Sequence, residues 1–271
     1  MTTLADIGGI SVTDAPYNAD PTGSADSTSA IQSAIDAAYT LNNMRFVLFP
    51  SGTYRITNQL NCFEIHRNPR DHGHLLYGST AGSARPKLKL DNNASGYNTP
   101  SSPKAVIRFW RQCHPVEGCD NSIPDETAGA NFDQTFRGID IEVGTGNSGA
   151  VGLQFAGAQM CAIEDTKSVM NSGYAGIRSV PGVMSCISNI HIVGGTYGID
   201  GLKTDHPAYV GITLENQATY ALYQMIGNND DQPFCGFRII KAAAPAILTV
   251  QHGGSDTYGP GFTFVDGTFE F

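Results

Sequence analysis

Short segments that start with Gly and an apolar residue recur at an almost constant interval in the second half of the 271-residue chain. In the last two segments Ala replaces the Gly. The strand starts are 22 to 25 residues apart and fall at Leu153, Ile177, Ile199, Leu222 and Ile247. A second apolar series interleaves with the first, at residues 139–143, 163–165, 190–192, 212–214, 238–240 and 262–265. Each period therefore holds at least two short strands, which is typical of a stacked solenoid.

The repeat favours one class of solenoid, the parallel β-helix. Leucine-rich repeats have a similar period but need a fixed L-x-x-L-x-L ladder, which this sequence lacks. We therefore predict an all-β fold, a single-stranded right-handed parallel β-helix with apolar side chains inside. The second series predicts one inward ladder of isoleucines, formed by Ile139, Ile163, Ile190 and Ile212.

One amphipathic helix is predicted near the N-terminus. Apolar residues recur at helical spacing between a cap at Asp26 or Ser27 and a stop at Asn42 and Asn43. Such a helix would cover the first rung, whose apolar side chains would otherwise meet water. We predict one β-helix domain over residues 1–271, in which 1–60 form the cap and first rungs, 61–131 irregular insertions and 132–271 regular rungs.

Composition excludes several classes of protein. Charged residues make up only 15% of the chain, which also has 31 glycines, and this argues against helical bundles and coiled coils. The net charge of −9 and the absence of a basic cluster argue against nucleic-acid binding, and no apolar run is long enough for a membrane helix. The six cysteines form no CxxC pair, so we expect no metal site and no cofactor. Cys113 and Cys119 could be bridged or remain thiols.

Several segments resemble a known family. Residues 18–35 (NADPTGSADSTSAIQSAI) and 49–54 (FPSGTY) are similar to the opening of the pectate-lyase-like β-helix superfamily. Residues 149–159 (GAVGLQFAGAQ), 173–177 (GYAGI) and 193–199 (VGGTYGI) resemble the N-terminal β-helix of the β-1,3-glucanases (laminarinases) of glycoside hydrolase family 55.

The resemblance to family 55 implies an inverting hydrolase built of two β-helix halves, with glucan bound between them. It places the Glu that acts as the general acid in the second half, which a chain of 271 residues does not include. The chain would then be the N-terminal half of a larger enzyme or would work with a partner chain. The first half positions the attacking water. In this role Gln159 matches a glutamine of the family and Ser179 approximately matches a serine, whereas a second glutamine is replaced by Ala156.

Carboxylates on the predicted strands are candidate acid and base groups. Asp140 and Glu142 lie two apart and face solvent together, and Glu164 and Asp165 are expected about one rung further along. Stacked carboxylates could act in hydrolysis or hold Ca²⁺, or they could belong to an ordinary solvated strand face. Glu142, Glu164 and Asp165 are therefore retained as candidate catalytic residues.

Polar and aromatic residues of the Gly-apolar strands are candidate substrate ligands. Tyr174 and Tyr197 precede successive strands at equivalent positions, and an aromatic ring can stack on the apolar face of a sugar. We expect Gln154, Gln159, Tyr174 and Ser179 to line one open face. A separate ionisable cluster is predicted to form a solvated loop, and it consists of His66, Arg67, Arg70, Asp71, His72 and His74.

Three functions stay open at this point: inverting hydrolysis of β-1,3-glucan, β-elimination by a polysaccharide lyase, and tailspike-like glycan binding without catalysis. A polysaccharide is the expected partner, and the expected location is extracellular although the segment MTTLADIGG is no signal peptide. The aromatic run at residues 261–271 lacks a cap. We therefore expect a second β-helix half or another subunit to cover that end.

Overall fold

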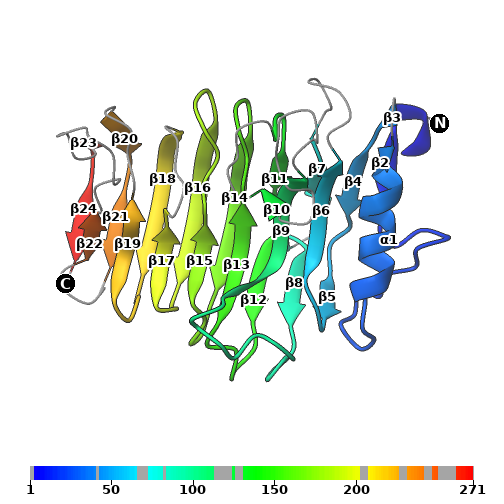
Figure 1. The fold of residues 1–271 in the computed structure, drawn as a ribbon. Coiled ribbons are helices and arrows are strands. Elements are labelled where there is room, and N and C mark those ends of the chain that lie inside the picture. The colour runs from blue at the N-terminus through cyan, green and yellow to red at the C-terminus, as the bar shows by residue number, and fades with distance from the viewer. Residues whose placement is uncertain are drawn as a thin grey trace.

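The structure is a computed structural model that describes residues 3–40, 43–65, 73–81, 84–112, 124–125, 131–201, 207–225, 231–240, 246–249 and 261–270. The chain winds into a right-handed parallel β-helix, as predicted, and its rungs stack in sequence order from one end to the other (Figure 1). Each turn contributes to two sheets, which we name sheet A and sheet B.

Sheet A contains fourteen described strands and sheet B contains eight. The strands of sheet A are β1 (Gly9–Ser11), β4 (Phe46–Phe49), β5 (Thr53–Ile56), β7 (Leu75–Gly78), β8 (Lys87–Leu90), β11 (Thr135–Arg137), β12 (Asp140–Val143), β14 (Ala162–Val169), β16 (Cys186–Val193), β18 (Ala208–Glu215), β20 (Asp231–Cys235), β21 (Arg238–Ile240), β23 (Gly261–Val265) and β24 (Thr268–Glu270). Those of sheet B are β6 (Leu60–Ile65), β9 (Lys104–Gln112), β10 (Pro124–Asp125), β13 (Ala150–Phe155), β15 (Ala175–Arg178), β17 (Tyr197–Asp200), β19 (Tyr220–Met225) and β22 (Ile247–Thr249). Residues 61–131, where insertions were expected, thus also contribute β6 to β9 to the rungs.

The Gly-apolar series forms a continuous ladder in sheet B, as its spacing predicts. Parallel pairing places each apolar residue opposite its equivalent in the next rung, and the ladder extends two rungs further towards the N-terminus than the repeat predicted. Its members are Leu60, Ile107, Leu153, Ile177, Ile199, Leu222 and Ile247.

The predicted isoleucine ladder of sheet A is wrong at one member. All four isoleucines are buried, but Ile163 pairs with Phe136 and Ile187, whereas Ile190 pairs with Thr166 and Ile212. The register on either side places Ile139 opposite Thr166. Ile163 therefore lies three residues before the ladder position. The spacing misled because Ile occurs both in the inward row of Ile163 and Ile187 and in the inward row of Ile139, Ile190 and Ile212.

A left-handed residue separates these two rows in each later rung. The φ angles at this corner are between 52° and 71°, and the register stacks the corners on one another. The corner residues are Gly138, Asp165, Asn189, Gly211, Gly236 and Asp266. Gly, Asn and Asp are the residue types that adopt this conformation most readily.

Helix α1 (Thr28–Ala38) covers the N-terminal end of the stack, as predicted (Figure 1). It buries Ile31, Ala34, Ile35 and Ala38 and packs against β1, β4 and β6. The N-cap position is Ser27, and the Asp26 carboxylate before it accepts a hydrogen bond from the Thr28 N–H at 3.0 Å. The helix ends at Ala38, before the predicted stop, and Tyr39–Thr40 (β2) then pairs with Asn43–Met44 (β3) in a small hairpin.

Three further features concern the chain as a whole. In the part of the chain that the structure describes, no helix is long and apolar enough to cross a membrane. Cys62, Cys161, Cys186 and Cys235 form no disulfide with one another, and Cys113 and Cys119 lie outside the described residues. In the last rung, Val265 and Phe269 are 49% and 42% exposed, and what covers that end stays a prediction.

Candidate functional site

A row of polar side chains alternates with the apolar ladder of sheet B. Arg108, Gln154, Arg178, Asp200 and Tyr223 are paired in register across five consecutive strands, from β9 to β19. The row projects away from the core ladder because neighbouring residues of a strand point to opposite faces. Charged and amide groups in a nearly buried row are unusual in a solenoid wall and mark this surface as the candidate site.

The centre of the row is an ion pair between two rungs. Arg178 Nε donates to Asp200 Oδ2 at 3.2 Å, and the two side chains are 16% and 1% exposed. In the preceding rung Gln154 is also buried, and its Nε2 has no hydrogen-bond partner among the described residues. A buried amide without a partner costs free energy, so Gln154 lowers the stability of this part of the row.

Four tyrosines lie beside this ion pair. The Tyr197 ring stacks on the Tyr223 ring with centroids 3.9 Å apart, stacks at 6.3 Å on Tyr220 and meets Tyr174 edge-on at 5.1 Å. The Arg178 guanidinium lies 5.9 Å from the centroid of Tyr174. We call Tyr174, Tyr197, Tyr220 and Tyr223 the tyrosine cluster.

The stacking bears on the role predicted for Tyr197, and sugar stacking on Tyr174 and Tyr197 stays a prediction. We expected open ring faces on which a sugar stacks, but parallel stacking turns the faces of Tyr197, Tyr220 and Tyr223 towards one another. Burial raises the pKa of Tyr174 and Tyr197 above the ordinary value, so both hydroxyls stay protonated at neutral pH. The cluster therefore offers half-buried ring edges and hydroxyl groups.

The other two residues predicted for this site, Ser179 and Gln159, lie in the connections after strands of sheet B. Ser179 follows β15 in a left-handed conformation and is buried, with its N–H donating to the Asp200 carbonyl at 2.9 Å. Gln159 is exposed between β13 and β14. Because Gln154 and Ser179 are both buried, the four residues expected on one open face do not share it. Roles for Gln159 and Ser179 in catalysis stay predictions.

The candidate carboxylates lie on sheet A and are all paired with cations. Glu142 contacts Lys87 Nζ at 2.8 Å and Lys89 Nζ at 3.0 Å. Partial burial alone would raise the pKa of Glu142, but the hydrogen bonds and charges of the two lysines outweigh it and lower the pKa. A general acid needs the opposite shift, so these contacts argue against that role for Glu142.

Glu164 and Asp165 do not stack on Asp140 and Glu142 as predicted. Their neighbour in the preceding rung is Arg137, which lies 3.4 Å from Glu164 and 3.2 Å from Asp165. The shift has the same cause as that of Ile163, since these residues precede the second inward row. No cluster of three or more His, Cys, Asp or Glu side chains able to hold a metal occurs among the described residues.

Of the ionisable cluster that was predicted to form a solvated loop, one residue, His74, lies within the described part of the chain. His74 is buried and stacks on Tyr39 with centroids 4.5 Å apart, so the prediction of a solvated residue is wrong there. The following strand β7 fixes His74 against the core. His66, Arg67, Arg70, Asp71 and His72 lie outside the described residues.

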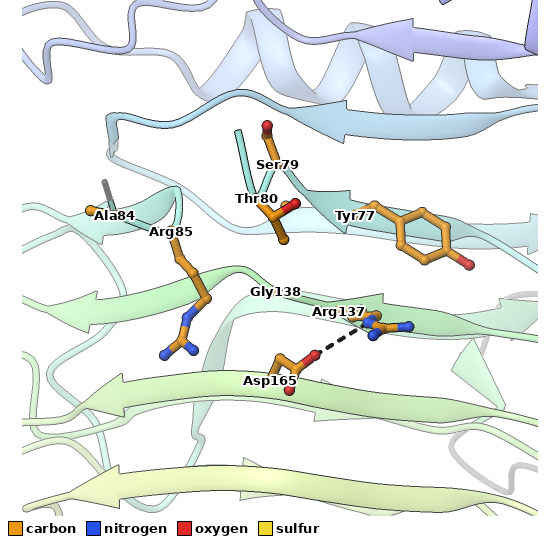
Figure 2. Close-up of a pocket in the computed structure, with 9 residues that line it drawn as sticks. Tyr77, Ser79, Thr80, Ala84, Arg85, Arg137, Gly138 and Asp165 are labelled. Atoms are coloured by element: carbon orange, nitrogen blue, oxygen red, sulfur yellow. Dashed lines mark hydrogen bonds and ion pairs between the residues drawn. The ribbon is translucent and has the colours of Figure 1, made fainter. Parts of the chain in front are cut away.

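A pocket lies on the other sheet, sheet A. Figure 2 shows this pocket of about 500 Å³ between β7, β11 and β14, with Tyr77, Arg85, Arg137 and Asp165 around it. It contains one predicted site residue, Asp165. Sequence reasoning missed the others, and it also missed Arg178 and Asp200. The signal for that pair was available, since each stands one residue after an apolar member of the sheet B ladder.

Comparison with protein families agrees with the fold. The family model of rhamnogalacturonase A/epimerase, pectate lyase-like proteins matches residues 9–230. The chain belongs to this family. The pectate-lyase-like resemblance found in the sequence is therefore confirmed, whereas the closer resemblance to family 55 laminarinases stays a prediction. No curated protein matches the chain.

Solved structures similar to this pectate-lyase-like chain share little sequence with it. PfbA, a surface adhesin of Streptococcus pneumoniae, is 16% identical with a TM-score of 0.48, and the match covers 90% of this chain and 62% of PfbA. ORF18 of Geobacillus virus E2 is 13% identical with a TM-score of 0.47, covering 98% and 61%. The catalytic unit of a GH87 α-1,3-glucanase from Streptomyces thermodiastaticus is 15% identical with a TM-score of 0.26, covering 96% and 68%. The chain spans less than two thirds of the first two proteins, and these similarities carry no argument about activity.

Proposed function

We propose that the protein is a secreted, carbohydrate-active β-helix that binds a polysaccharide along sheet B. The observation that carries the proposal is the half-buried tyrosine cluster beside the Arg178–Asp200 ion pair. The tyrosine hydroxyls and the Arg178 guanidinium together supply both donors and acceptors for sugar hydroxyls. Membership of the rhamnogalacturonase A/epimerase family supports a polysaccharide as ligand.

For the reaction, we propose inverting hydrolysis, with β-1,3-glucan as the first substrate to test. Inversion uses two carboxyl groups about 6.5 to 9.5 Å apart, one as the acid and one as the base. Asp200 is the one carboxylate among the described side chains of sheet B, and at 1% exposure it holds Arg178 in place and does not reach a substrate. The acid and the base would therefore come from elsewhere, from a further β-helix half or from another subunit, which would also cover the C-terminal end of the stack.

A second candidate is β-elimination on a uronate polymer. Two guanidinium groups, Arg108 and Arg178, belong to the row, and a guanidinium matches a carboxylate in charge and geometry. Arg108 also lies 4.8 Å from the ring centroid of Trp110 at the same surface.

One assay separates these functions. The protein is incubated with laminarin, pectate and alginate, and both reducing ends and the absorbance of unsaturated products are followed. Hydrolysis releases reducing ends alone, elimination produces both signals, and binding without catalysis produces neither while retarding the protein in a gel that contains the glycan.

Variants then test the surface itself. Removing two hydroxyls in Tyr174→Phe/Tyr220→Phe should weaken glycan binding several-fold, because the rings keep their packing and lose only hydrogen bonds. Tyr209→Phe is the matched control, since Tyr209 is fully buried in the core. Equal binding by both variants would contradict a glycan site at the tyrosine cluster.

A further inference from the structure

The pocket on sheet A has the dimensions of a small-ligand site. Its volume of about 500 Å³ lies within the range usual for such sites, and it spans three rungs, from β7 across β11 to β14 (Figure 2). The tyrosine cluster belongs to sheet B, so the pocket is a separate surface of the molecule.

Two of the residues that line the pocket are glycines. Gly78 and Gly138 are stacked in consecutive rungs, and a Cβ added at Gly78 would overlap the Gly138 carbonyl oxygen, so the two backbones approach closely here. Gly138 adopts a φ of 71°, which a residue with a side chain rarely takes. At these two positions the pocket is lined by backbone alone.

Ion pairs fix these polar groups in place. Arg137 Nε donates to Asp165 Oδ2 at 3.2 Å, and Asn189 Nδ2 donates to Asp165 Oδ1 at 2.8 Å. Across the pocket, Arg85 Nε donates to Asp140 Oδ1 at 2.9 Å. A guanidinium has five N–H groups and a carboxylate oxygen two lone pairs, so each group retains capacity for a ligand while its orientation is held.

The charges around the pocket select the class of ligand. Both guanidinium groups that line the pocket are already paired with carboxylates, Arg85 with Asp140 and Arg137 with Glu164 and Asp165. An anionic ligand would have to compete with these carboxylates, whereas an uncharged ligand would not. The hydroxyls of Ser79 and Thr80 and the ring of Tyr77 suit a ligand with many hydroxyls and an apolar face.

From these observations we propose that the pocket is a second saccharide site, which binds one unit of an uncharged glycan. It goes beyond the proposed function, because it lies on the other sheet and binds without a chemical step. A chain with two glycan surfaces can hold a polymer at one while the other engages it, which raises the effective affinity.

Calorimetric titration tests the site directly. Laminaritriose, cellotriose, maltotriose, mannotriose and xylotriose are the neutral probes, and trigalacturonate is the charged one. At least one neutral probe should bind, and Arg137→Ala should weaken it about tenfold or more, as expected for lost hydrogen bonds to a charged group. Thr80→Trp, which fills the pocket from an exposed position, should abolish it.

Arg238→Ala is the matched control, since Arg238 forms an equally exposed ion pair with Glu270 on the same sheet. All titrations are repeated in the Tyr174→Phe/Tyr220→Phe background, so that loss of the sheet B surface and loss of the pocket are read separately. The proposal is overturned if no neutral probe binds in that background, if Arg137→Ala and Thr80→Trp bind as the control does, or if trigalacturonate binds the pocket more tightly than every neutral probe.

Discussion

Arg178 and Asp200 form an ion pair that joins β15 to β17, with Nε and Oδ2 3.2 Å apart and the Asp200 side chain 1% exposed. Arg178→Ala would leave the carboxylate buried without its cation. We expect this to cost about 3 to 5 kcal/mol of unfolding free energy, measured by urea denaturation. Arg238→Ala, which breaks an exposed pair with Glu270, should cost about 0 to 1 kcal/mol. Equal losses would mean that water reaches the Arg178–Asp200 pair.

Replacing Tyr209 by Phe should stabilise the protein, whereas Arg178→Ala should destabilise it. The Tyr209 ring is fully buried and stacks on Phe234 at 4.1 Å, but its hydroxyl has no hydrogen-bond partner among the described residues. Removing a buried hydroxyl of this kind relieves a desolvation cost of about 1 to 3 kcal/mol. Tyr209→Phe should therefore raise the urea midpoint with an unchanged m value. A lower midpoint would reveal a partner for the hydroxyl.

The sheet B ladder was predictable because one row of apolar residues repeats once per rung. From Leu153 to Ile247 the spacing alone identifies the partners that the structure pairs. In sheet A the same reasoning assigned Ile163 to the wrong row. One inward row lies just before the left-handed corner and another just after it, and an apolar residue in either row recurs once per rung. Periodicity locates a rung but cannot say which of two adjacent rows an isoleucine occupies.

The candidate site was harder to predict than the fold. Tyr174 and Tyr197 were found because they recur at equivalent places, and the structure does bring them together. Their stacked arrangement depends on ring orientation, which sequence spacing does not encode. The cations beside Glu142 and Asp165 were missed for a similar reason, because they come from the preceding rung at separations that differ between rungs.

The corrected register has a measurable consequence. Ile190 and Ile212 are direct neighbours in adjacent rungs, whereas Ile163 belongs to the other inward row. Each single change to Ala should cost about 2 to 5 kcal/mol. In double-mutant cycles, Ile163→Ala and Ile187→Ala, which the structure pairs, should couple by about 0.5 kcal/mol or more, and Ile163→Ala with Ile190→Ala should be nearly additive. The reverse order would support the single ladder that the sequence suggested.

The buried imidazole of His74 should make the protein sensitive to acid. Burial lowers the pKa of His74 from 6.5 to about 4, against the smaller opposing effect of a hydrogen bond with Gln134. Between these two values the unfolded chain binds the proton and the folded chain does not, so stability falls as the pH falls from 6.5 to about 4. A shift of this size corresponds to roughly 3 kcal/mol over the window.

His74→Phe tests this origin of acid sensitivity, because Phe can keep the stack on Tyr39 and cannot bind a proton. Urea denaturation at a series of pH values should show the wild-type free energy of unfolding falling below pH 6.5, with a clearly smaller slope in His74→Phe. Tyr209→Phe should keep the wild-type slope, since burial raises the pKa of Tyr209 and this residue does not titrate in acid. A slope unchanged by His74→Phe would assign the acid sensitivity to other groups and would mean that His74 is protonated in the folded protein.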